Sequence, residues 1–396
     1  MDWLLQVEAQ LAEQVCWSVA TLLDLEVDLL FLGTTSPCLE TDEPDPPSDG
    51  APKGFRARGH PKDHRPDLPQ VVIGLAVTRT GIPIRAWTWP GDANDQALIR
   101  QAQADLRAWR LGRVVWVADR GFDSAENRRC LQRAGGHRIL GEKPRGEGAE
   151  ARAALARQGR HRAVAGSLEA KEVVIDDGTM RDRFVICRDP DQAERDAAVR
   201  GRLLDQLEGL IGGSDGRTPA ERDAIACRVR AEPGLARFLR VTKGGLLRVD
   251  RAAVDAEARL GGKPLLRTSD PALSAEDVAL GHRQLLLVER AWRDMRTTLD
   301  LRPVRHRKEG RIRAHVVLCW LALLLIRLAE TGTGETWRAI RGEMDRLHLG
   351  RFRGTAGEVL QRTEITPRQA SMLKALALPE PPRILGITPV PAARTA

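Results

Sequence analysis

The stretch Arg113-Val-Val-Trp-Val-Ala-Asp119-Arg-Gly-Phe-Asp123 decides the fold. Its opening residues are almost all apolar, which is typical of a strand that is buried on both faces of a sheet. Glycine and polar residues follow at once, and residues 124–134 then have the pattern of a helix. A buried strand that leads into a helix is a unit of α/β proteins, in which ligands and catalytic groups lie at the carboxyl ends of strands. Asp119 occupies that position.

The segments around this stretch complete an α/β pattern. The expected elements are a helix over the first twenty or so residues, a strand over 25–33, a hairpin of strands over 71–78 and 82–89, a helix over 94–109 and a short strand over 138–140. A surface loop rich in Pro, Gly, Asp and Arg separates the first strand from the hairpin. This order predicts a mixed sheet covered by helices.

The composition changes after residue 141, where weak alternating strands (172–176, 183–187 and 244–249) and a charged helix (192–211) suggest a separate α+β insertion. Helices are expected again over 274–299, 311–330 and 335–347. Many prolines beyond residue 363 favour a helix followed by a loose tail. We therefore expect an N-terminal helix (1–24), the first part of a core (25–141), an insertion (142–273), the C-terminal helices of the core (274–347) and a helix with a tail (348–396).

The composition is that of a globular protein with a polyanionic partner. The chain is 42% hydrophobic and 29% charged, with a net charge of +8. Charge alone favours nucleic acid and solvated arginines about equally. The six cysteines have no spacing of a zinc site or a disulfide framework, and no signal peptide is evident. The longest apolar run, residues 316–326, is too short to span a bilayer, so no membrane partner is expected.

Two acidic residues are candidates for chemistry, and each has a structural alternative. Asp119 is equally suited to a turn or to the N-cap of the helix that follows, although Asp123 and Ser124 are also capping residues. Glu289 lies at the margin of the apolar stripe of a helix, and the alternative is an i,i+4 pair with Arg293 on a solvated face. Taken alone, both residues favour the structural alternative.

A series of motifs in one order favours the chemical interpretation. They are Gly59-His-Pro-Lys-Asp-His-Arg-Pro-Asp-Leu-Pro-Gln-Val-Val-Ile-Gly-Leu-Ala-Val77, Gly81-Ile-Pro-Ile84, Pro90-Gly-Asp-Ala-Asn-Asp95, Val117-Ala-Asp-Arg-Gly-Phe122, Leu266-Arg-Thr-Ser-Asp-Pro271, Val288-Glu-Arg-Ala-Trp-Arg293, Leu301-Arg-Pro-Val-Arg-His-Arg307 and Arg313-Ala-His-Val316. This series resembles the core of bacterial insertion-sequence transposases of the IS-four superfamily, whose catalytic residues are three acidic side chains (DDE).

That resemblance implies an RNase H-like fold, a mixed sheet flanked by helices and interrupted by a β-rich α+β insertion. It implies two divalent ions, Mg2+ or Mn2+, which assist phosphoryl transfer at the ends of a mobile element. The second family carboxylate corresponds to Asp119 and the third to Glu289. The partners it implies are double-stranded DNA, as inverted repeats and target, and a second copy of the chain on that DNA. The expected location is the bacterial cytoplasm, in association with the nucleoid.

The chain departs from the family pattern at the first carboxylate. The family motif Asp-Thr-Thr-Ser reads Gly33-Thr-Thr-Ser36 here, and glycine cannot ligate a metal. Asp28 is no substitute, because five residues of extended strand place it about 16 Å away and on the opposite face.

Other positions depart from the family as well. On its late helix the family carries a tyrosine, an arginine, the catalytic glutamate and a lysine. The corresponding residues of this chain are, in the same order, His282, Leu285, Glu289 and Arg296. A family Asp-Gly is Gly261-Gly262, and the first strand begins so early that a truncated start is expected. Together with Gly33, these departures predict an impaired or inactive copy, and the alternative is a non-catalytic DNA-binding or dimerising remnant. A nuclease or other phosphodiesterase on the same fold is disfavoured, because the motifs are those of transposases.

A basic segment follows the helix of Glu289, and the alternative to a DNA contact there is a solvated loop. The residues expected to contact DNA are Arg120, Arg293, Arg296, Arg302, Arg305, Arg307, Lys308, Arg311 and Arg313. Aromatic residues for base stacking are absent from the basic segment. In the insertion, only Phe184 and Phe238 are large aromatics, and each suits a core position equally well.

Overall fold

The computed structural model describes residues 2–23, 28–41, 43–47, 54–59, 65–107, 109, 113–133, 136–142, 148–176, 181–302, 304–355 and 357–389. Residues 25–27 of the first expected strand, and residues 60–64 and 303 of the motifs, lie outside the described residues. The chain divides into two compact units. Unit 1 comprises Met1–Leu25, Thr34–Ala93 and Leu287–Ala396, and unit 2 comprises Glu26–Gly33 and Asn94–Leu286.

A mixed sheet forms the centre of unit 2. Its strands follow the order β1 (Leu29–Thr35), β4 (Val115–Ala118), β5 (His137–Glu142), β11 (Leu265–Thr268), β8 (Arg181–Arg188), β7 (Leu168–Asp176) and β6 (Arg162–Ala165). The first three strands run parallel, and the later ones are antiparallel to their neighbours. Along the chain, a hairpin follows β1 and precedes β4. This order of elements confirms the expected α/β fold class and is consistent with an RNase H-like fold.

Helices cover both faces of this sheet. They are α3 (Asp95–Arg107), α4 (Ala125–Arg133), α5 (Ala149–Ala156) and α10 (Ala275–Arg283), and the short 3-10 helix η1 (Arg120–Phe122) joins β4 to α4. On one face, Ala154 of α5 packs against Phe184 and Leu265. On the other face, Gly281 of α10 lies close to Ile139 of β5 and to Leu29 of β1. The strand β4 that leads to Asp119 is fully buried, as its sequence predicted.

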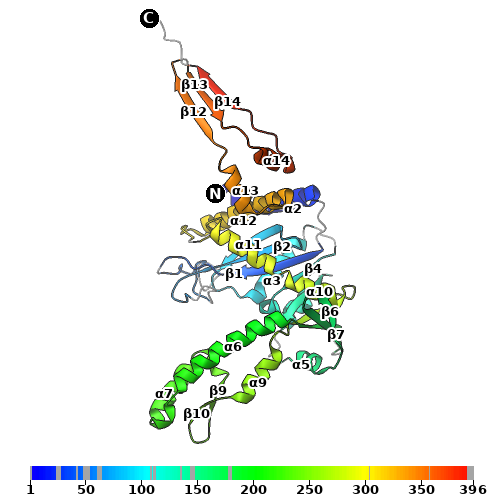
Figure 1. Cartoon of the computed structure of the whole chain (residues 1–396), viewed down its shortest axis with the longest axis vertical. Helices are drawn as coiled ribbons and strands as arrows, with labels where there is room; N and C mark the ends of the chain where they lie inside the picture. Colours follow the sequence, from blue (N-terminus) through cyan, green and yellow to red (C-terminus); the bar gives the residue numbers. More distant parts are fainter. Residues whose placement is uncertain are drawn as a thin grey trace. The chain divides into compact units, whose positions relative to one another are not determined.

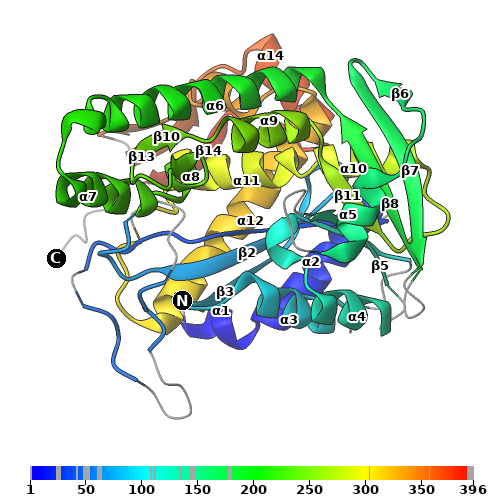
Figure 2. The same ribbon diagram turned by 90° about the horizontal axis from the view of Figure 1, so that it is seen from below.

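The rest of unit 2 is a helical extension with its own small core. Its elements are α6 (Pro190–Ile211), η2 (Ser214–Gly216), α7 (Pro219–Arg230), α8 (Pro233–Ala236), β9 (Leu239–Val241), β10 (Leu247–Val249) and α9 (Arg251–Leu260). In Figures 1 and 2, α6 is a long helix accompanied by α9, and the hairpin β9–β10 lies near α7. Leu207, Val229, Leu235 and Phe238 form the core of this extension.

Two features of residues 142–273 differ from the separate insertion suggested by composition. The strands β6, β7, β8 and β11 continue the sheet of β1, β4 and β5, so only the helical extension stands apart from that sheet. Phe184 and Phe238 are both fully buried, which makes them core residues rather than stacking platforms.

Unit 1 is built around a hairpin and a long apolar helix. Its elements are α1 (Asp2–Gln6), α2 (Glu8–Leu23), β2 (Val71–Thr78), β3 (Pro83–Pro90), α11 (Leu286–Thr297, from its second residue), α12 (Glu309–Thr333), α13 (Trp337–Met344), β12 (Leu349–Gly354), β13 (Gly357–Arg362), α14 (Pro367–Ala375) and β14 (Ile384–Pro389). The hairpin turn contains Gly81 at φ +83°, a conformation that favours glycine.

Helix α12 packs on the hairpin. Val19, Ile82 and Leu324 meet in one cluster, and Trp320 donates from Nε1 to the carbonyl of Pro83 at 3.3 Å. The helix is long and apolar enough to cross a membrane, but 61% of its apolar window is buried inside the protein. It therefore fills the role of a core helix, as the sequence predicted.

The C-terminal segment contains strands as well as a helix. The order β12-β13-β14 forms a separate antiparallel sheet, so residues 384–389 are a strand where the prolines had favoured a loose tail. The expected helix over 274–299 is also two helices, α10 and α11, separated at residues 284–285.

Candidate functional site

Three strand ends of unit 2 bring Gly33, Asp119 and Gly141 side by side. Leu32 of β1 is in register with Ala118 of β4, which is in register with Leu140 of β5. The next residue of each strand therefore lies beside the next residue of its neighbour, about 4.8 Å apart between strands. A carboxylate at position 33 would stand next to that of Asp119 and on the same face of the sheet.

Asp119 is exposed, and only part of its carboxylate is used within the protein. Its Oδ1 accepts from the backbone N–H of Arg120 at 2.7 Å and so caps the 3-10 helix η1. The helix α4 is capped instead by Ser124, the residue before it, whose Oγ accepts from the backbone N–H of Asn127 at 3.1 Å. The capping alternative is thus true of the short turn. One lone pair of Oδ1 is used by the cap, and the rest of the carboxylate remains available for a ligand.

Asp119 lines a cleft of about 470 Å³ that lies entirely within unit 2. Acidic and basic side chains face it together, which suits ionic ligands better than apolar ones. The charged residues that line it are Asp119, Arg120, Glu142, Asp196, Arg200, Arg237, Glu257 and Lys263, and His282 completes the set of titratable residues.

His282 reaches the cleft from α10. Its Nε2 atom is buried and has no hydrogen-bond partner in the described part of the chain, while the residue as a whole is half-buried. Burial lowers the pKa of His282, and the charge of Asp119 opposes that shift only in part. The imidazole is therefore held in its neutral form, which keeps a lone pair for a proton or a ligand.

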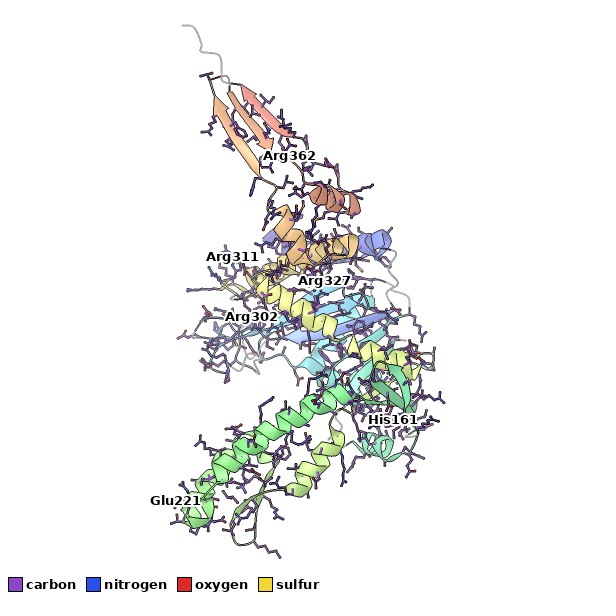
Figure 3. All side chains as sticks on the ribbon, in the orientation of Figure 1. His161, Glu221, Arg302, Arg311, Arg327 and Arg362 are labelled. Carbon is purple, nitrogen blue, oxygen red and sulfur yellow. The ribbon has the colours of Figure 1, made fainter. Side chains whose placement is uncertain are left out.

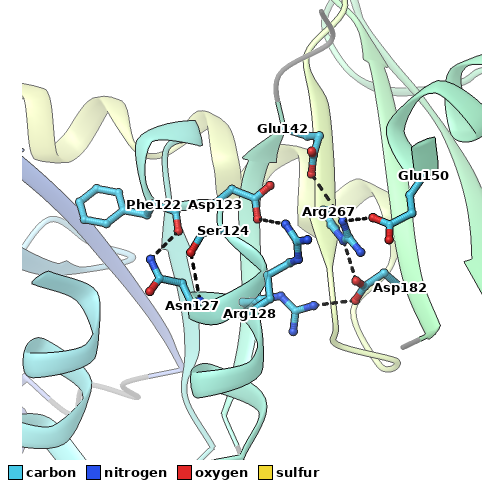
Figure 4. A network of polar contacts seen from close by, with 10 residues as sticks. Phe122, Asp123, Ser124, Asn127, Arg128, Glu142, Glu150, Asp182 and Arg267 are labelled. Atoms are coloured by element: carbon cyan, nitrogen blue, oxygen red, sulfur yellow. Dashed lines mark hydrogen bonds and ion pairs between the residues drawn. The ribbon is translucent and has the colours of Figure 1, made fainter. Parts of the chain in front are cut away.

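A network of ion pairs links strands of the sheet, and Glu142 belongs both to this network and to the lining of the cleft (Figure 4). Arg267 donates to Asp182 and to Glu150, each at 2.6 Å, and lies 3.9 Å from Glu142. Arg138 is fully buried and donates to the same Asp182 at 2.7 Å. Because buried arginines are stable only when paired, this network fixes the strands β5, β8 and β11 against one another.

Glu142 is the perturbed carboxyl group of this network. Burial, together with a hydrogen bond and the negative charge of Asp123, raises the pKa of Glu142 to about 8, and Arg267 opposes the shift. Asp123 itself is paired with Arg128 at 2.7 Å. Neither Glu142 nor the position of His282 over the cleft was predicted from the sequence, because both depend on strands and helices that meet from distant parts of the chain.

Glu289, the other expected carboxylate, belongs to unit 1. It is exposed on α11, while Val288, Trp292 and Met295 of the same helix are buried. Across the described residues Glu289 has no ion pair, including none with Arg293. The structural alternative of an i,i+4 pair is therefore not what the structure contains.

The basic residues expected to contact DNA fall into two groups. In unit 2, Arg120 is exposed. In unit 1, the exposed basic residues are Arg293, Arg296, Arg305, Arg307, Lys308 and Arg311. Arg302 and Arg311, near the two ends of the basic segment, are labelled in Figure 3. Lys308 is the N-cap of α12 and forms no side-chain cap hydrogen bond, so the amino end of this helix lies beside these cations.

Arg302 and Arg313 differ from the other basic residues. Arg302 is half-buried, with buried guanidinium nitrogens. The guanidinium of Arg313 lies over the ring of Phe55, donates to the carbonyl of Thr88 at 2.6 Å and pairs with Glu309 at 2.8 Å. These contacts anchor the beginning of α12 and leave Arg313 little freedom to bind a ligand.

Comparison with known proteins adds one decisive match. The family model described as a transposase DDE domain matches residues 53–325, well over half of the chain. The chain belongs to the DDE transposase family. Proteins of this transposase family act in the cleavage of DNA during transposition and generally use divalent metal ions.

The other comparisons are weaker. No curated protein matches this transposase-family chain. Among solved structures, a piggyBac transposase synaptic complex with hairpin DNA is similar at 9% identity and a TM-score of 0.36. That similarity covers 88% of this chain and 51% of the other chain, so the chain spans about half the length of that transposase.

The donor set of this transposase chain does not fit the three-carboxylate metal site that the resemblance implies. Within the described residues, no group of three or more His, Cys, Asp or Glu side chains is placed to hold a metal ion. In unit 2 the reason is visible, because Gly33 offers no oxygen beside Asp119 and the nearest other donor over Gly141 is a histidine nitrogen.

Proposed function

We propose that this chain binds double-stranded DNA at the inverted repeats of an insertion sequence, and that its cleavage and strand-transfer activity is impaired. The observation that carries the proposal is the register of β1 with β4, in which Leu32 pairs with Ala118; the next residues along the two strands are Gly33 and Asp119. A family site needs carboxylate oxygens that converge from different elements. With glycine at position 33, one of these oxygens is missing.

In this proposal, Asp119 and Glu289 are the surviving catalytic carboxylates. Their exposure supports the role, since neither carboxylate is consumed by an ion pair within the described residues. In an intact relative, we expect two ions, Mg2+ or Mn2+, to be held by such residues together with an aspartate at position 33. A homodimer on paired DNA ends and a location in the cytoplasm, at the nucleoid, belong to the same proposal.

The exposed cations of unit 1 and Arg120 are proposed as phosphate contacts. Their affinity for DNA comes from the release of counterions and does not need a metal. A protein with this surface and a weakened metal site would bind DNA without cutting it. A non-catalytic DNA-binding or dimerising transposase remnant is therefore the second candidate, and it differs from the first only in having no residual cleavage.

The test uses the full chain and a duplex that carries the inverted repeats flanking its own gene. Binding is measured by fluorescence anisotropy, and strand cleavage is measured on denaturing gels with Mg2+ or Mn2+. We expect salt-sensitive binding and at most trace cleavage. Efficient metal-dependent cleavage by the chain as it stands would overturn the proposal of impairment, and absence of binding at low salt would overturn the proposed partner.

A further inference from the structure

Gly141 leaves a small space in the cleft, and the side chains of His282 and Asp119 border it. A Cβ atom at this position would lie 3.1 Å from Nε2 of His282 and 3.4 Å from Oδ1 of Asp119. One donor atom comes from the end of β4 and the other from α10, and both belong to unit 2. A carboxylate oxygen and an imidazole nitrogen therefore both lie within 3.4 Å of this point, as does the backbone nitrogen of Arg120, at 3.2 Å.

The imidazole nitrogen at this point has no partner of its own. Nε2 of His282 is buried and forms no hydrogen bond with any described residue, and Oδ1 of Asp119 accepts only from the backbone of Arg120. Buried polar atoms are nearly always paired, so an orphaned atom in a native structure indicates an ion, a water molecule or a ligand. The neighbouring carboxylate attracts a cation and repels an anion.

We propose that Asp119 and His282 together bind one divalent transition-metal ion, through a carboxylate oxygen and an imidazole nitrogen, and that this site prefers Mn2+ to Mg2+. Imidazole is a common ligand of first-row transition metals, whereas Mg2+ is held by oxygen ligands in near-ideal octahedral geometry and keeps several waters. In this chain the neighbouring strand end supplies no second carboxylate, so the nitrogen becomes the second protein donor.

This inference rests on the proposed function in one respect only, which is that the ion is placed at Asp119. Metal binding is measured without DNA, so a failure of the inference is distinguishable from a failure of DNA binding or cleavage. A protein that binds DNA but shows no nitrogen-ligated Mn2+ would retain the proposed function and lose this inference.

The experiment titrates the full chain with Mn2+ and follows the free ion by electron paramagnetic resonance. Pulsed measurements on the bound ion detect coupling to a directly coordinated 14N nucleus. We expect one such ion per chain, a 14N signal, and retention of most of the bound Mn2+ in the presence of tenfold more Mg2+. Bound Mn2+ without a 14N signal, or its displacement by equal Mg2+, would overturn the proposal.

Variants locate the site. His282→Ala is expected to abolish the 14N signal and to weaken Mn2+ binding at least tenfold, and Gly141→Ala is expected to do the same, because its methyl group fills the space between the donors. His161→Ala is the matched control, since Nε2 of His161 is also buried without a partner but the residue does not line the cleft (Figure 3). Equal effects of the control and His282→Ala would contradict the assignment, as would unchanged binding in Gly141→Ala.

Discussion

At the scale of single residues, the strand ends of unit 2 explain why position 33 matters. In the parallel register of β1 and β4, a side chain at position 33 is the immediate neighbour of Asp119. Asp28 cannot replace it, because it stands at the beginning of β1 and its carboxylate accepts from the backbone N–H of Leu29 at 2.7 Å. In the proposed site, this glycine takes the place of a carboxylate donor, and no other acidic residue of that strand restores it.

Glu142 carries a testable pH dependence. Its pKa in the folded protein is raised from 4.5 to about 8, so the folded state binds the proton more tightly than the unfolded state. The stabilisation is complete below pH 4.5 and is lost as the pH rises towards 8. We expect the free energy of unfolding of Glu142→Gln to fall less than that of the unchanged protein between pH 5 and 8, as measured by urea denaturation.

The control for this prediction is Glu172→Gln, since the hydrogen bond from Arg183 lowers the pKa of Glu172. That carboxylate stabilises the fold once ionised, so its replacement should remove stability at pH 8 rather than preserve it. If Glu142→Gln and the unchanged protein lost the same stability between pH 5 and 8, the burial of a protonated Glu142 would be refuted.

The sequence predicted only the part of the site that lies on one local pattern. Asp119 follows a continuous apolar strand, and the motif of Gly33 follows another, so both strand ends were predictable. His282 was visible only as a departure from a family motif, because no local pattern tells which residue of α10 meets the end of β4. Glu142 lies close to Arg267, which is more than a hundred residues away in the chain, and contacts of this kind leave no local signal.

At the scale of elements, α12 shows how an apolar helix divides between core and surface. Leu323 is fully buried, whereas Leu325, two residues later, is 67% exposed. We expect Leu323→Ala to lower the free energy of unfolding by about 2 to 5 kcal/mol, because it leaves a cavity in the core. Leu325→Ala should change it by less than about 0.5 kcal/mol.

Urea denaturation of the two variants, followed by circular dichroism, measures this difference. The two replacements remove the same atoms from the same helix, so helix propensity cannot account for a difference between them. Equal losses of stability in Leu323→Ala and Leu325→Ala would contradict the orientation of α12 on the hairpin.

Elements with a regular local pattern were predicted well, and those that depend on distant partners were not. The strand β2 spans residues 71–78, as its run of β-branched residues predicted. The residues of the short strand β11 were recognised only as part of a sequence motif and not as a strand. The reason is that these four residues acquire strand structure by pairing with β5 and β8. The sheet of β12, β13 and β14 was missed, because β14 ends in a proline, has no alternating pattern and leaves its apolar residues largely exposed.

At the scale of the whole molecule, the excess of positive charge predicts electrostatic binding of DNA. Each phosphate contact contributes about −0.9 to the slope of log K against log salt concentration. Replacing Arg305, Arg307 and Arg311 by alanine should therefore make the slope about 2 to 3 units less steep. The slope is measured by anisotropy titrations at salt concentrations between about 50 and 300 mM.

Replacement of Arg228 and Arg230 of α7 by alanine is the control for the loss of net charge, since both side chains are exposed but lie outside the basic segment. An equal change of slope per charge in the two variants would indicate a non-specific effect of net charge. The basic segment would then have no special role in DNA binding.

In the proposed function, the missing carboxylate at position 33 impairs this DDE transposase. The most direct test compares the unchanged chain, Gly33→Asp and Gly33→Asn for metal-dependent cleavage of the flanking inverted-repeat DNA. Asparagine has nearly the same shape as aspartate but no charge. We predict that only Gly33→Asp gains cleavage, by at least about a hundredfold, since several kcal/mol of transition-state stabilisation return with the carboxylate. Cleavage by the unchanged chain at the rate of Gly33→Asp would contradict the claim, as would an equal gain in Gly33→Asn.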